Sequence, residues 1–139
     1  MLMNVKVELE ENLKFNAQGE TGHNMPMDAS ESSGGDDSAA SPMEMLLAGL
    51  GGCTGIDVVM ILRKMKAEIE DFNIDIEAER AEEHPKRYKK IHLKYYIKGK
   101  NLEDKKVQKA IDLSENKYCS ASASLNAEIT HSYEIEKTD

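Results

Sequence analysis

The sequence predicts an α+β fold with an antiparallel sheet and the element order βββ–α–ββ–α–β. Short segments alternate apolar and polar residues with period two, which is typical of half-buried antiparallel strands. A longer segment, 41–66, is apolar on nearly every side of a helix, so it is expected to be a buried helix. Strands and helices in this order indicate an α+β class.

Length and composition limit the functions that the chain can have. Its 139 residues fit one domain, 1–139, and its net charge of −8 argues against nucleic-acid binding. No basic stretch precedes an apolar one at the N terminus, so no signal peptide is expected. The two cysteines are far apart and form no CxxC motif, which favours a cytoplasmic protein. The glycines and carboxylates of 41–66 argue against a membrane span.

Three short strands are expected at the N terminus. They lie at 4–9, at 13–18 and around 23–27, and each places alternate apolar residues on one face. The polar segment 28–40 follows, and it has too few apolar residues to pack. It is therefore expected to be a flexible surface loop.

The long apolar helix begins with a capping box. The Ser41 hydroxyl can accept from the Glu44 amide while the Glu44 carboxylate accepts from the Ser41 amide, and Pro42 suits the first helical position. Two glycines precede Cys53. If the helix restarts after them, Cys53 lies in a first turn and the helix dipole favours its thiolate. If the helix continues, the glycines allow another backbone or a ligand to approach closely.

A hairpin is expected after this helix. Segments 72–79 and 91–98 alternate apolar and charged residues, and the chain turns near His84-Pro85. The outer residues are mainly acidic on the first strand and include two lysines on the second, which suits cross-strand pairing.

A second helix and a last strand complete the chain. Asn101 with Asp104 is expected to cap the helix, which ends near Tyr118, and Cys119 follows in a run of small residues. The last strand is expected at 127–135.

The two cysteines are the candidate reactive residues. One buried cysteine is usually a core residue, but two elements that pack on the same core can bring Cys53 and Cys119 together. Such a pair can reduce a peroxide, because the first thiol becomes a sulfenic acid and the second converts it into a disulfide. Asp57 lies one turn after Cys53 and opposes a thiolate, so a cation must compensate or Asp57 pairs elsewhere.

The segments SPMEMLLAGLGGCTGIDVVMIL and ENKYCSASASL resemble the OsmC/Ohr family, the osmotically induced and organic hydroperoxide resistance proteins. The element order agrees over essentially the whole chain. The resemblance implies an intertwined homodimer whose two long helices are wrapped by antiparallel sheets. It also implies reduction of small organic hydroperoxides, with Cys53 as the attacking thiol and Cys119 as the resolving thiol, a dithiol reductant, and no metal or organic cofactor.

Two positions depart from the family pattern. Family peroxidases hold the thiolate with an arginine from the N-terminal strands, whereas the first arginine here is Arg63. Lys14 or His23 can substitute, although an ammonium lacks the planar fork of a guanidinium. The family's glutamate directly follows the proline, where this chain has Met43, and Glu44 comes one position later.

Three hypotheses follow. The first is a peroxidase that uses Cys53 and Cys119. The second is a non-catalytic OsmC-like protein that binds a small apolar molecule in a dimer-interface pocket, and the missing arginine favours it. The third is zinc bound by both cysteines and His23 or His131, although no metal-ligand spacing is present. A histidine on an apolar strand face, such as His131, is more typical of the core.

Overall fold

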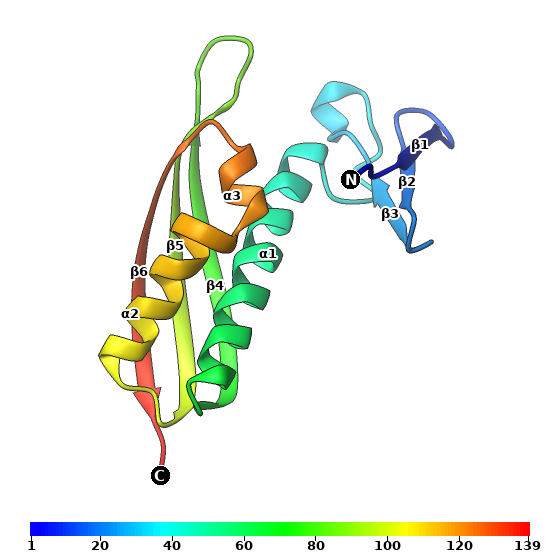
Figure 1. Ribbon diagram of the computed structural model, residues 1–139. Coiled ribbons are helices and arrows are strands. Elements are labelled where there is room, and N and C mark those ends of the chain that lie inside the picture. Colours follow the sequence, from blue (N-terminus) through cyan, green and yellow to red (C-terminus); the bar gives the residue numbers. More distant parts are fainter. The chain divides into compact units, whose positions relative to one another are not determined.

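The computed structural model describes all 139 residues, which divide into two compact units, Met1–Ala48 and Gly49–Asp139. Each unit has its own three-stranded sheet, and helix α1 (Pro42–Lys64) begins in the first unit and continues into the second (Figure 1). The α+β class is confirmed. A single domain over 1–139 stays a prediction.

The N-terminal unit contains the three predicted strands. They are β1 (Val5–Leu9), β2 (Phe15–Gly19) and β3 (Asn24–Met27), and they form an antiparallel sheet in the order β1-β2-β3. The expected half-burial is wrong for β1. Its apolar residues Val5, Val7 and Leu9 are 57%, 53% and 58% exposed, because no apolar layer of this chain covers that strand.

Segment 28–40 has internal order although it is polar. The buried Asp28 carboxylate accepts hydrogen bonds from the amides of Ala29 (2.7 Å) and Ser38 (3.1 Å) and from the Ser38 hydroxyl (2.7 Å). The bonds from Ser38 lower the pKa of Asp28. A 3₁₀ turn, η1 (Glu31–Ser33), lies between them. The flexibility of this segment stays a prediction.

The C-terminal unit has a mixed sheet in the order β4-β5-β6. Its strands are β4 (Glu68–Arg80), β5 (Tyr88–Lys100) and β6 (Glu128–Lys137). The β4–β5 hairpin is antiparallel, as predicted, but β6 pairs with β5 in parallel, so the expected all-antiparallel sheet is wrong here. Parallel neighbours need a crossover of about a dozen residues or more, and the second helical region supplies it.

The crossover holds three helical segments. They are α2 (Asp104–Leu113), a π-helical turn η2 (Ser114–Tyr118) and α3 (Ser120–Ser124). The predicted end at Tyr118 is confirmed, whereas α3 was not predicted. The expected cap at Asn101 is wrong: Glu103 precedes α2, and the Asn101 side chain donates to the Lys66 carbonyl at 2.9 Å.

Helix α1 keeps the predicted start and runs unbroken through its glycines. The Glu44 amide donates to Ser41 Oγ (3.2 Å) and the Ser41 amide donates to Glu44 Oε1 (3.3 Å), which confirms the capping box. The alternative in which the helix restarts before Cys53 is wrong. A close neighbour is found instead, because a Cβ on Gly51 would lie 2.8 Å from Cδ1 of Ile76 on β4.

The core of the C-terminal unit lies between its sheet and the helices on one face of that sheet (Figure 1). Helix α1 buries a single stripe, which consists of Leu50, Thr54, Val58 and Leu62. Ile56 and Met60 on its other side are 63% and 52% exposed, so complete burial of this helix is wrong for one chain. By length and composition alone α1 could span a bilayer.

We expect Gly99→Ala to destabilise the protein by about 2–3 kcal/mol, the range of an overpacked core. Gly99 lies opposite a register shift in β4, and an added Cβ would overlap the backbone carbonyl of Glu68. Urea unfolding checks this, with Lys98→Ala on the exposed neighbour as the control. A Gly99→Ala midpoint equal to that of the unmodified protein would contradict the tight contact.

Candidate thiol site

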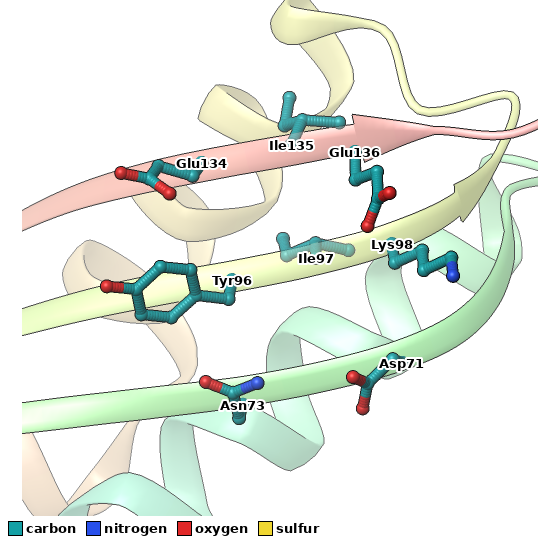
Figure 2. A pocket seen from close by; sticks show the side chains of 8 residues that line it. All are labelled: Asp71, Asn73, Tyr96, Ile97, Lys98, Glu134, Ile135 and Glu136. Atoms are coloured by element: carbon teal, nitrogen blue, oxygen red, sulfur yellow. The ribbon is translucent and has the colours of Figure 1, made fainter.

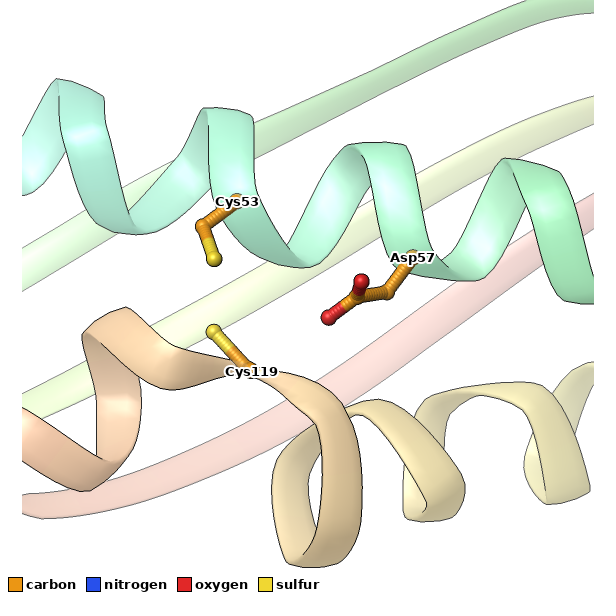
Figure 3. A group of neighbouring side chains, drawn as sticks. All are labelled: Cys53, Asp57 and Cys119. Carbon is orange, nitrogen blue, oxygen red and sulfur yellow. The ribbon is translucent and has the colours of Figure 1, made fainter. Parts of the chain in front are cut away.

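The structure brings the two predicted cysteines together. Cys53 projects from the middle of α1, Cys119 projects from the start of α3, and their sulfur atoms point toward one another (Figure 3). Asp57 reaches the same space from the next turn of α1. Both sulfurs and a carboxylate oxygen of Asp57 lie within 4.8 Å of one another, and neither cysteine is in a disulfide.

The π-helical turn η2 determines where Cys119 lies. Its geometry allows the Cys119 amide to donate to the Ser114 carbonyl at 2.7 Å. Cys119 then caps α3, and its sulfur accepts from the Ser122 amide at 3.4 Å. Single π-turns are frequent at functional sites. Here the turn ends one helix and aims the thiol at α1.

A buried chain of hydroxyl groups holds Asp57 in place. Tyr95 Oη lies 2.9 Å from Thr54 Oγ1, which lies 2.8 Å from Ser114 Oγ, and Ser114 donates to Asp57 Oδ2 at 3.1 Å. A hydroxyl has one proton, so Ser114 must accept from Thr54, and Thr54 must accept from Tyr95. All protons in the chain therefore point toward Asp57. The sequence left two alternatives for Asp57, a compensating cation or a partner elsewhere. The structure shows the second, because Asp57 accepts from the Ser114 hydroxyl.

The site is short of positive charge. No lysine, arginine or histidine forms a hydrogen bond or ion pair with Cys53, Asp57 or Cys119. Lys14 and His23 belong to the N-terminal unit, and their role as substitutes for the arginine stays a prediction.

Burial raises the pKa of Tyr95 to about 12, and the negative charges of Glu115, Cys119 and Asp57 contribute to this rise.

Burial also raises the pKa of the Cys119 thiol. Hydrogen bonds with Ser122 lower this pKa in part, and the neighbouring Cys53 raises it again. Cys119 is 4% exposed, whereas Cys53 is partly exposed. The two thiols therefore differ in access, and burial makes Cys119 hold its proton more firmly than an ordinary thiol does.

His131 is half-buried and hydrogen-bonded through both ring nitrogens, so it is only partly the core histidine that was predicted, and it is not a member of the cysteine cluster. Its Nδ1 lies 3.0 Å from Glu115 Oε2, and its Nε2 lies 3.1 Å from Gln108 Nε2. Sequence reasoning missed Glu115 and the hydroxyl chain. The available signal was the pair Thr54 and Asp57, two polar residues in an apolar helix that required buried partners.

The outer face of the C-terminal sheet is polar, as predicted. It holds a hollow of about 180 Å³ (Figure 2), lined by Asp71, Asn73, Tyr96, Ile97, Lys98, Glu134, Ile135 and Glu136. Cross-strand ion pairs join Lys89 to Glu79 and Lys94 to Glu134. Neither cysteine lines this hollow, so it is separate from the thiol site.

Comparisons with known proteins agree with the geometry. Residues 35–134 match the sequence model of the family described as OsmC-like protein. The chain is 40% identical to Protein YhfA of Escherichia coli strain K12 over 135 residues, which are 96% of this chain and 98% of that protein. The crystal structure of a hypothetical protein from Aquifex aeolicus VF5 matches with a TM-score of 0.80 at 32% identity, covering 99% of both chains.

A protein named for hydroperoxide resistance shares the fold. The crystal structure of an organic hydroperoxide resistance protein OsmC from Legionella pneumophila matches with a TM-score of 0.69. The match covers 98% of this chain and 97% of that chain at 16% identity. At this identity the likeness shows the fold alone.

We expect Cys53 to be alkylated faster than Cys119 near neutral pH. Cys53 is more accessible than Cys119. The raised pKa of Cys119 also means that, below that pKa, its thiolate fraction is smaller than that of an ordinary thiol, by tenfold for each pKa unit. Iodoacetamide rates measured against pH for Cys119→Ser and Cys53→Ser give the two thiols separately. The Cys119 rate should still be rising at pH values above the ordinary thiol range. Identical rate profiles for the two variants would contradict the assignment of distinct roles.

Proposed function

Because the chain belongs to the OsmC-like protein family, we propose that it reduces organic hydroperoxides with the thiol pair Cys53 and Cys119. The observation that supports this best is the placement of two unpaired sulfurs within 4.8 Å of each other, on different elements. The name of the Legionella pneumophila protein, which shares the fold, points to the same substrate class.

The proposed reaction has two thiol steps. The Cys53 thiolate attacks the outer oxygen of the hydroperoxide, the O–O bond breaks, and the alkoxide leaves as an alcohol after it takes a proton. Cys53 is then a sulfenic acid. The Cys119 sulfur attacks the Cys53 sulfur, and the hydroxyl leaves as water with the proton of Cys119. Two thiols have lost two electrons to the peroxide, and a dithiol reductant restores them by exchange.

Formation of the disulfide requires the sulfurs to approach to about 2 Å. Helix α1 is tied to the sheet by its buried stripe, so a large shift of Cys53 would disturb the core. Helix α3 is short, and none of its five residues is buried. Cys119 can therefore move toward Cys53 by a local change of α3, which suits a resolving thiol.

A second candidate function is the binding of a small apolar molecule without catalysis. The N-terminal unit has an apolar cavity of about 500 Å³, which is within the range of small-molecule sites. Its lining consists of Val7, Leu13, Phe15, Met27, Asp28, Ala29 and Pro42. The absence of a cation beside Cys53 favours this function over fast peroxide reduction.

We expect slow turnover of cumene hydroperoxide with a dithiol reductant. Cys53→Ser should abolish it. Cys119→Ser should complete one turnover and stop at the sulfenic acid, which dimedone traps for mass spectrometry. An ammonium lacks the fork that holds a thiolate and a carboxylate together, so we expect a rate below that of an arginine-containing relative measured in parallel.

Two outcomes of this assay would contradict what we expect: the first contradicts the low rate, and the second contradicts the proposed peroxidase activity itself. Equal rates for this protein and the arginine-containing relative would show that the missing arginine does not limit the reaction. No thiol oxidation at all in the unmodified protein would leave ligand binding as the function.

We also propose that the protein is a cytoplasmic homodimer. Apolar side chains are exposed in both units, at Ile56 and Met60 on α1 and along β1. A monomer rarely leaves so many large apolar residues in water, and a second copy is the cover that the family resemblance implies. Obligate dimers often have no stable folded monomer.

Sedimentation should therefore find a dimer at micromolar concentration. Ile56→Glu should shift the protein to monomer or unfold it, because a charge would be buried in the subunit contact. Asn73→Glu adds the same charge on the exposed outer sheet face and should leave the dimer intact. A compact monomer of the unmodified protein would show that the exposed apolar face needs no partner copy.

A further inference from the structure

The geometry of Cys53, Cys119 and Asp57 points to a binding site for one zinc-type divalent cation, and we propose such a site here. Two sulfurs and one carboxylate oxygen lie within 4.8 Å of one another (Figure 3). Atoms bound to one zinc ion at about 2.0–2.3 Å lie within roughly 4 Å of each other. The three donors therefore need to close by only about 1 Å to share an ion.

The charge of the site favours a cation. Asp57 supplies one carboxylate, and each thiol that ionises adds a further negative charge. Nothing positive is hydrogen-bonded or ion-paired to the three residues. In the peroxidases that the chain resembles, an arginine supplies the positive charge beside the thiolate. A bound dication would neutralise two thiolates in the same place.

The surroundings of Asp57 suit a metal ligand. Its Oδ2 atom accepts from Ser114, which leaves Oδ1 for an ion. The hydroxyl chain through Thr54 and Tyr95 fixes the carboxylate from the buried side. Such outer hydrogen bonds hold the ligands of metal sites in orientation and are part of the affinity of those sites.

The donor set selects the class of metal. Calcium and magnesium take oxygen ligands, whereas two thiolates with one carboxylate suit zinc. Three protein ligands leave a fourth position for water, as in open zinc sites. Cys53 and Asp57 are partly exposed, which gives an ion a path to the donors. The third ligand is Asp57 and not the histidine of the sequence-based hypothesis.

The test is a titration of the reduced, metal-free protein with Co²⁺, a spectroscopic substitute for zinc. We expect one Co²⁺ per chain, with a thiolate-to-cobalt charge-transfer absorption that zinc removes by displacement. Cys53→Ser and Cys119→Ser should each weaken this absorption and the binding. Asp57→Asn should keep the absorption but lower the affinity at least tenfold, because the amide is a weaker ligand that can still accept from Ser114.

Asp75→Asn, which removes an exposed carboxylate on β4, is the matched control and should bind Co²⁺ like the unmodified protein. Protein oxidised to the disulfide should not bind. Binding without the charge-transfer absorption, or binding unchanged in Asp57→Asn, would overturn the proposed site. The titration contains no hydroperoxide, so its outcome is independent of the proposed peroxidase activity.

Discussion

The thiol site depends on the buried hydrogen-bond chain from Tyr95 to Asp57. Its hydroxyl groups come from three elements, namely β5, α1 and η2, and they are almost completely buried. A buried polar group without a partner costs about 1–3 kcal/mol, so the register of the three elements that satisfies the chain is favoured over registers that break it. Thr54 directly follows Cys53, and the Ser114 carbonyl accepts from the Cys119 amide. The same contacts that satisfy the chain therefore position both cysteines.

Local patterns predicted most of the fold and singled out the two cysteines that the structure brings together. The capping box at Ser41 and the β4–β5 hairpin depend on residues close in sequence, and both were found. The parallel pairing of β6 with β5 was not predicted, because an alternating strand has the same pattern in either direction. The exposure of β1 was also missed, since alternation indicates an apolar face but not what covers it.

The polar part of the site could not be predicted because it consists of contacts distant in sequence. Thr54 and Ser114 are ordinary residues in helical segments, and only the folded chain shows that they meet at 2.8 Å. The contact between Glu115 and His131 likewise joins two different elements and is seen only in the folded chain. Burial raises the pKa of Glu115, while His131 lowers it in part, and the Glu115 Oε1 atom is buried without a partner. The folded protein therefore holds the Glu115 proton more firmly than the unfolded chain does. The stability of the fold falls as pH rises from the ordinary glutamate pKa through the raised one.

The position of Cys119 in the crossover between β5 and β6 links the redox state of the cysteines to the stability of the fold. Cys53 and Cys119 lie on either side of the whole β4–β5 hairpin in sequence. A disulfide between them would close a long loop. In the chain-entropy account such a cross-link raises the free energy of the unfolded chain, and so stabilises the folded protein, by about 4 kcal/mol. Oxidation would thus fasten the crossover to α1, and reduction would release it. The redox state of one pair of sulfurs would then set how firmly the C-terminal half of the chain holds together.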